Sequence, residues 1–235
     1  MKINLLAFFK LIENESYVVI KPSYKLPDYD KGSDIDIFCY DADEIAEKVT
    51  AFLADYVNHE STISIVDSPY KIHIDLLVNN EINFRFDLYK QLPVYKNINL
   101  KAAYFSSVIE SSSIQVLTVA GDSSKIKVPS ITDDLILRYV EYHEYYAERP
   151  DKIKHVEYIQ NKLVSNKNKN EKVKMLDKLH YYTAFPNVVY RDKTLKEVWK
   201  EKRSYYQSNI VKIKHLYTTA GLGALVNKVI QKVRK

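Results

Sequence analysis

The stretch from Lys71 to Tyr89 constrains the fold more than any other part of the chain. Apolar side chains occupy its even positions and polar side chains occupy most of its odd positions, with Asn79–Glu81 between two such runs. Side chains of a strand alternate between its two faces, so the pattern predicts a β-hairpin with one wholly apolar face. A three-residue loop pairs Val78 with Ile82 and keeps that apolar face continuous across both strands.

The opposite face of this hairpin is polar. It gathers His73, Asp75, Asn83, Arg85 and Asp87. The predicted register places His73 opposite Asp87, and Asp75 opposite Arg85. We therefore expect the apolar face to belong to a core and the polar face to be available for chemistry.

The other hydrophobic patterns predict an α+β fold, an N-terminal mixed β-sheet with helices followed by a C-terminal all-helical domain. Pro22 and Pro27 predict a loop after the first strand. Asp41 and Ser130 are expected N-caps. A boundary near 128–130 divides the chain into an α/β domain over 1–128 and a helical domain over 129–235. Expected strands cover 17–20, 33–40 and 61–66, and expected helices cover 5–13, 42–56, 131–146, 151–163, 172–182, 194–206 and 209–216.

The net charge of +5 conceals an uneven distribution along the chain. Residues 1–128 hold 13 basic and 18 acidic side chains, whereas residues 129–235 hold 22 basic and 12 acidic ones. A division of this size indicates two regions with different roles. Basic side chains interleaved with tyrosines bind nucleic acid in some proteins, and an anionic glycan is an equally natural partner. A solvated helical face without a ligand is the third interpretation.

Several classes of protein are excluded by composition. Cys39 is the single cysteine, so the chain is not a disulfide scaffold. No run approaches the roughly 20 apolar residues of a membrane span, and the apolar opening at Ile3–Phe9 is too short for a signal-peptide core. We therefore expect a cytoplasmic protein. The basic amphipathic pattern from Leu222 onward predicts a helix that docks on the protein itself or on the inner face of a membrane.

The motif Gly32–Ile37 carries the sharpest chemical signal. Asp34 and Asp36 lie two positions apart on a predicted strand, so both carboxylates leave the same face while the isoleucines beside them face the core. Neighbouring carboxylates both ionise readily when a cation lies between them, and hard oxygen ligands suit Mg²⁺. A third acid from the hairpin, Asp87 or Asp75, would complete a two-metal site with ions ~3.5–4 Å apart. The competing interpretation is an exposed, solvated pair of aspartates.

These residues resemble the nucleotidyltransferase superfamily that shares a fold with DNA polymerase β. Ser23 precedes Asp34 by ten intervening residues, Asp34 and Asp36 match the D-x-D of that family, and Asp87 matches its third acid. The resemblance covers about residues 15–160. More narrowly, the run Tyr17–Leu26 together with Asp34–Ile37 resembles nucleotidyltransferase-like proteins of bacterial surface-polysaccharide loci. Pro22 stands where the family usually has glycine, and we expect no short helix in the loop that follows.

The resemblance implies an activity and a set of ligands. Asp34, Asp36 and Asp87 would hold two Mg²⁺ ions, for which Mn²⁺ is a substitute, and the enzyme would transfer a nucleoside monophosphate from an NTP to a small-molecule or glycan acceptor. The expected nucleotide contacts come from Lys21, Ser23, Gly32, Ser33 and Arg85.

The hairpin adds His73 and Asp75 as residues that support the metal ligands. Arg85 has an alternative as the ion-pair partner of Asp75. Asp75 has two alternatives, as a fourth acid of the site and as a solvated strand residue. Lys21 has an alternative as an ordinary surface lysine.

Three other functions stay open. The first is a catalytically silent module with the same fold that binds a partner. The second is a metal-dependent glycosyltransferase whose D-x-D binds a nucleotide sugar, which is less favoured because only 33 residues precede Asp34. The third is a toxin-type nucleotidyltransferase that acts on RNA.

Overall fold

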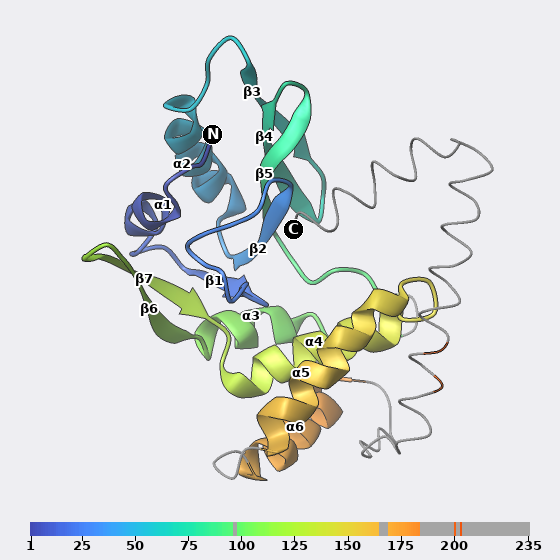
Figure 1. Ribbon diagram of the computed structural model, residues 1–235. Coiled ribbons are helices and arrows are strands. Elements are labelled where there is room, and N and C mark those ends of the chain that lie inside the picture. Colours follow the sequence, from blue (N-terminus) through green and yellow to red (C-terminus); the bar gives the residue numbers. More distant parts are fainter. Residues whose placement is uncertain (96–97, 165–168, 184–199, 201–202, 204–235) are drawn as a thin grey trace, which may run out of the picture.

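The computed structural model describes residues 1–95, 98–164, 169–183, 200 and 203 of the 235-residue chain. The fold is α+β and is built on a five-stranded mixed sheet with the strand order β1-β2-β5-β4-β3 (Figure 1). Strands β2 and β5 run parallel, and the three other neighbouring pairs run antiparallel. The strands are β1 (Tyr17–Ile20), β2 (Ser33–Cys39), β3 (Ser61–Asp67), β4 (Lys71–Val78) and β5 (Glu81–Tyr89).

Two helices cover the apolar face of this sheet. Helix α1 (Leu5–Leu11) begins where the side chain of Asn4 accepts a hydrogen bond from the backbone of Ala7, and α2 (Ala42–Ala54) begins at the predicted cap Asp41. Their apolar sides and the inward-facing residues of the strands form one buried core, which includes Cys39 as expected. This core fixes which face of β2 and β5 is left for polar residues.

The predicted hairpin forms, but its loop is shorter than expected. Asn79 and Asn80 both adopt left-handed backbone angles, with φ of 52° and 60°, and Val78 pairs with Glu81 rather than with Ile82. This is the two-residue turn that Asn favours because it tolerates positive φ. The predicted three-residue loop was therefore wrong.

A register shift next to Leu76 restores the predicted pairing of the residues beyond it, which the shorter loop by itself would have moved by one position. Leu77 pairs with Ile82 and Leu76 with Phe84, so Asn83 is the extra residue on β5. From there on, the register places His73 opposite Asp87 and Asp75 opposite Arg85. The predicted polar face is confirmed for these four residues.

Asn83 itself is buried. Its side chain donates to the backbone oxygen of Met1 and accepts a bond from the Tyr29 hydroxyl. It therefore helps to hold the N-terminus.

The other face of the sheet meets a second group of helices, which lie below the strands in Figure 1. Val18 and Phe38 project from β1 and β2 into a second buried core, where the rings of Phe38 and Phe105 lie 4.8 Å apart. These helices cover the β1 side of the face. They are α3 (Ala103–Glu110), α4 (Ile131–Tyr145), the 3₁₀ turn η1 (Pro150–Lys152), α5 (Ile153–Val164) and α6 (Lys169–Tyr182).

A separate hairpin was not predicted. Strands β6 (Ser113–Val119) and β7 (Asp122–Val128) pair around a turn at Ala120 and Gly121, which have φ of 51° and 87°. β6 buries Leu117 alone among its seven residues, so it lacks the alternation that marks a half-buried strand. Leu117 and Ile126 attach the hairpin to the first core.

The remaining predicted elements have mixed outcomes. The strands and helices expected between residues 5 and 66 and between 131 and 182 are present, with ends shifted by up to three residues. The elements expected at 194–206, 209–216 and from Leu222 onward lie outside the described residues. Among the residues that the structure describes, none forms a helix long and apolar enough to cross a membrane.

Candidate metal centre

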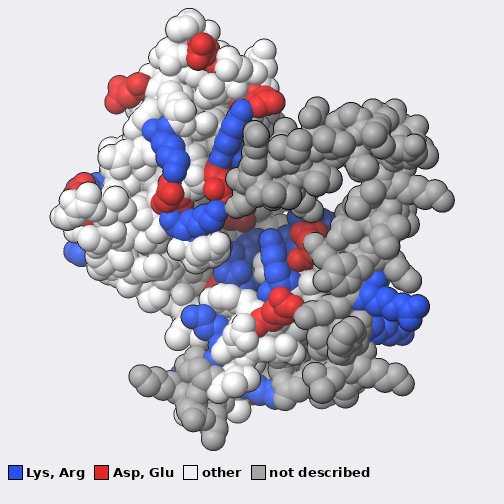
Figure 2. All heavy atoms as spheres, in the orientation of Figure 1, with Lys and Arg blue, Asp and Glu red and all other residues white. Residues whose placement is uncertain are grey.

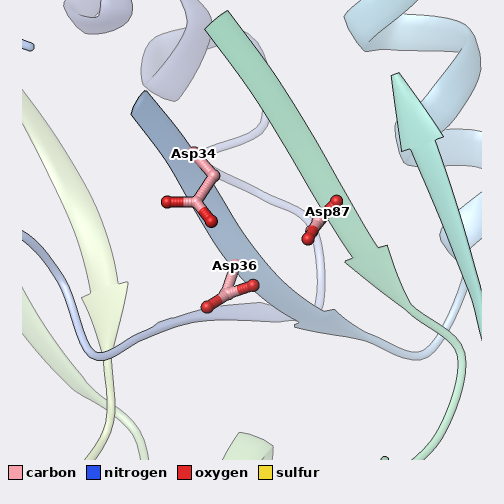
Figure 3. Close-up of side chains that lie close together, drawn as sticks. All are labelled: Asp34, Asp36 and Asp87. Atoms are coloured by element: carbon pink, nitrogen blue, oxygen red, sulfur yellow. The ribbon is translucent and has the colours of Figure 1, made fainter. Parts of the chain in front are cut away.

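Three carboxylates converge on the polar face of the sheet. Parallel pairing of β2 with β5 places Asp36 beside Asp87 and Asp34 beside Arg85. One carboxylate oxygen from each of Asp34, Asp36 and Asp87 lies within 4.8 Å of the others, and the three side chains point toward a shared space (Figure 3). Asp87 is buried, Asp36 is half-buried and Asp34 is exposed, so the cluster is open on the Asp34 side.

The cluster carries negative charge that its surroundings do not fully balance. Burial raises the pKa of Asp36, and the charges of Asp34, Asp87 and Glu141 raise it further, against the opposing effect of Lys21. Ionising this carboxylate is therefore harder than ionising an aspartate in water. Hard oxygen donors and unmet negative charge are the conditions that favour a divalent cation such as Mg²⁺. The residues present fit such an ion.

Two side chains of β4 contact Asp87. Nδ1 of His73 forms a short hydrogen bond with one carboxylate oxygen, and Nζ of Lys71 lies 3.2 Å from the other. The structure thus places His73 against the buried acid, where it can orient that carboxylate. Lys71 was not predicted, although strand alternation puts it on the same face as His73 and Asp75.

Arg85 and Asp75 bind each other across β4 and β5. Nε and Nη2 of Arg85 donate to the two oxygens of Asp75 at 2.6 Å and 2.7 Å. These hydrogen bonds are the main cause of a raised pKa for Arg85. Both groups are therefore engaged in the ion pair that the sequence offered as an alternative. Within the described part of the chain, Asp75 is not among the acids that could share a metal ion.

Lys21 stands at the end of β1, beside the cluster. Its Nζ lies 3.3 Å from Oδ2 of Asp36 and 2.6 Å from Oε2 of Glu141. Burial by itself lowers the pKa of Lys21, but the charges of Asp36 and Glu141 outweigh that effect and raise it. Lys21 is therefore a charged ammonium held within the site, in contrast to an ordinary surface lysine.

Glu141 on α4 is another site residue that sequence reasoning missed. It forms ion pairs with Lys21 and with Lys152 of η1, and His155 of α5 lies 3.5 Å from its Oε2. The available signal was its spacing, because Glu141 follows the buried Leu137 by four residues and so shares a helix face with it. In Figure 2, basic and acidic side chains are interleaved where the sheet meets the helices.

The predicted phosphate-binding turn makes local contacts. Ser23 is exposed, and its Oγ accepts a hydrogen bond from the backbone of Lys25 at 3.2 Å. As expected, no helix forms among residues 21–32, which the structure describes in full. Ser23 is therefore exposed to solvent, and its hydroxyl contacts the backbone of its own turn.

Gly32 and Ser33 shape the entry into β2. Gly32 has a φ of 78°, which glycine adopts without strain, and its N–H donates to the backbone oxygen of Asn83 at 2.8 Å. The hydroxyl of Ser33 accepts from the backbone of Asp30 at 3.2 Å. These bonds fix the position from which Asp34 starts the strand.

Comparison of the chain with protein-family models, with curated proteins and with solved structures finds no match. The geometry of the site is therefore the main guide to its chemistry. That geometry consists of three converging carboxylates, a histidine and a lysine on Asp87, and a lysine shared by Asp36 and Glu141.

Proposed function

We propose that this protein is a magnesium-dependent nucleotidyltransferase that moves a nucleoside monophosphate from an NTP to a small-molecule or glycan acceptor. The observation that carries the proposal is the convergence of Asp34, Asp36 and Asp87 from two parallel strands within 4.8 Å. A D-x-D strand with a third acid on a later strand is the arrangement that the resemblance to polymerase-β-like nucleotidyltransferases implies. Surface-polysaccharide biosynthesis is the setting that the same resemblance favours.

Each residue of the site has a separate proposed role. Asp34, Asp36 and Asp87 would hold two Mg²⁺ ions, which when bound neutralise the triphosphate and make an acceptor hydroxyl more acidic. His73 keeps the carboxylate of Asp87 in one orientation. In the reaction, the acceptor oxygen bonds to the α-phosphorus, the bond to the bridging oxygen breaks, and pyrophosphate leaves while the acceptor proton passes to solvent.

The helical part of the chain is proposed to bind the acceptor. We assign residues 129–235 to a helical domain whose 22 basic and 12 acidic side chains favour an anionic acceptor. A phosphorylated glycan intermediate has this character. With such an acceptor, the enzyme would act in the cytoplasm at the inner face of a membrane.

One observation favours a second candidate, a catalytically silent module of the same fold that binds a partner. Lys21 and Lys71 each place an ammonium 3.2–3.3 Å from a carboxylate of the cluster. These internal cations offset part of the negative charge and reduce the need for a metal ion. A metal-binding measurement separates the two candidates.

The decisive experiment is thermal unfolding of the full chain with ATP, CTP, GTP or UTP, each with and without Mg²⁺. A ligand at 100 times its Kd stabilises a protein by about 2.7 kcal/mol, which is a shift of roughly 5–10 °C for a chain of this size. We expect such a shift with one nucleotide, dependent on Mg²⁺ and absent in Asp36→Asn. Asp28→Asn is the matched control, because Asp28 is an exposed aspartate that pairs with Lys2.

The alternatives give different results. If no nucleotide shifts the transition in the presence of Mg²⁺, the transferase is contradicted and the silent module is favoured. A shift with a nucleotide sugar alone would favour the metal-dependent glycosyltransferase. Retention on RNA that falls steeply with salt would favour an enzyme that modifies RNA.

A further inference from the structure

A carboxylate of the helical segment reaches the acidic cluster through one lysine. Nζ of Lys21 lies between Oδ2 of Asp36, at 3.3 Å, and Oε2 of Glu141, at 2.6 Å. The side chains of Lys21 and Glu141 are 20% and 11% exposed, so water screens this bridge much less than a surface ion pair. A single ammonium therefore links α4 to the D-x-D strand.

Glu141 is in turn held by the elements that follow it. Lys152 of η1 forms an ion pair with Oε1 of Glu141, and His155 of α5 lies 3.5 Å from Oε2. Burial alone raises the pKa of Glu141, but the nearby imidazole of His155, the charge of Lys21 and the hydrogen bonds from Lys152 and Lys21 together lower it well below its usual range. Glu141 is therefore a fixed anion, and Lys21 is bound on one side by a partner that stays ionised.

The backbone conformation of Lys21 also indicates that the fold holds this residue in place. Its φ is 50°, in the left-handed region that a residue with a Cβ atom seldom adopts. Residues in such conformations persist where the surrounding structure holds them, and they concentrate at functional sites. The position of this ammonium is thus imposed by the fold on both its backbone and its side chain.

We propose that Glu141 is a positioning residue that holds Lys21 beside Asp36 and offsets part of its charge, and that Lys21 is a built-in counter-cation that limits the affinity of the acidic cluster for divalent cations. The inference rests on the proposed metal centre. A divalent ion bound to Asp36 repels an ammonium that contacts the same carboxylate, so the two cations compete. Through Glu141, the helical segment therefore controls how readily the cluster binds metal.

The test is Mn²⁺ binding by the full chain, followed by the electron paramagnetic resonance signal of the free ion. We expect Lys21→Met to bind Mn²⁺ about tenfold more tightly than the wild type, because the competing charge is gone. We expect Glu141→Gln to bind about tenfold more weakly. The glutamine oxygen can still accept the hydrogen bond from Lys21 and keep it beside Asp36, but no anion then offsets the charge of Lys21.

The matched control is Lys178→Met. Lys178 also pairs with a buried carboxylate, that of Asp133 at 2.8 Å, but it lies on α6 in a cluster with Ser111. Its replacement should leave the affinity for Mn²⁺ unchanged. A variant that fails to fold loses binding, so tighter binding by Lys21→Met cannot arise from a folding defect.

The outcomes separate the two proposals. If the wild type binds Mn²⁺ and Asp36→Asn does not, the metal centre stands, and unchanged affinity in Lys21→Met or Glu141→Gln overturns the counter-cation alone. If the wild type shows no binding that depends on Asp36, the metal centre itself is contradicted, together with the inference that rests on it.

Discussion

Asp36 on β2 and Asp87 on β5 stand directly opposite each other on parallel strands, so their carboxylates leave the sheet from the same face. The strand backbone fixes the face from which each side chain projects. Two anions are thus held close together, and Asp34 adds a third. Like charges at this separation cost stability unless a cation joins them.

The first prediction concerns that cost. Burial and the neighbouring acids raise the pKa of Asp36 above its usual 3.8, so the folded state holds the proton more tightly than the unfolded chain. As pH rises from the unfolded pKa through the folded one, the folded state must release a proton that it binds more tightly, so the free energy of unfolding falls. Asp36→Asn should raise the free energy of unfolding in urea with a chelator present. Asp28→Asn should leave it unchanged, and lower stability in Asp36→Asn would contradict the charge conflict.

The second prediction tests the role of His73. Its imidazole orients Asp87, and loss of such a support commonly weakens metal binding by about 10–100-fold. His73→Gln should therefore weaken Mn²⁺ binding by about that factor in a titration of the full chain. The control is His59→Gln, because the side chain of His59 is 88% exposed and its carboxylate partner is the neighbouring Glu60. Equal affinities in the two variants would show that His73 has no part in the site.

The third prediction concerns the ion pair between Arg85 and Asp75. A guanidinium forms two parallel hydrogen bonds with a carboxylate, and an ammonium cannot reproduce that geometry. Arg85 is about one-third exposed, so we expect Arg85→Lys to lower the free energy of unfolding by about 1 kcal/mol. Urea denaturation measures this change in the free energy of unfolding. The control is Lys2→Met, which removes an exposed ion pair and should change stability less.

The same Arg85→Lys variant also tests phosphate binding. If Arg85 contacts the nucleotide, the variant should reduce the stabilisation by nucleotide and Mg²⁺ as well as the intrinsic stability. An unchanged ligand effect with reduced intrinsic stability would leave Arg85 with the structural role alone.

The fourth prediction is a pH dependence. The folded pKa of Glu141 lies well below the ordinary 4.5, so its ion pairs stabilise the protein above the unfolded pKa and are lost as pH falls toward the folded value. The difference in unfolding free energy between the wild type and Glu141→Gln should therefore shrink progressively below about pH 4.5. Urea unfolding across a pH series measures this difference. A constant difference would show that the carboxylate is not selectively stabilised in its ionised form.

Much of the sheet could be predicted because strand alternation is a local property. The polar pairs of β4 and β5 were predicted correctly from parity even though the loop was one residue shorter than expected. The bulge beside Leu76 compensated for that loop, since burial of one apolar face selects the register. Core packing thus restored the register that a two-residue turn alone would have shifted.

Other elements carried too weak a signal. Strand β6 buries Leu117 alone, so it shows no alternation, and the helical spacing of the buried residues in α3 extends over only eight residues. Lys71 and Tyr89 were overlooked although each continues the parity of the polar hairpin face. Tyr89 lies close enough to the cluster that burial and the charges of Asp36 and Asp87 raise its pKa.

By itself, the sequence determined that Asp34 and Asp36 share a face and that the hairpin has a polar side, because backbone geometry alone sets those directions. The tertiary structure decided that Asp87 rather than Asp75 joins them, because the parallel register of β2 and β5 depends on how the first core packs. It also decided that Glu141 meets Lys21 across 120 positions of sequence. No local pattern encodes such a contact, because it exists only when the second core holds α4 against the end of β1.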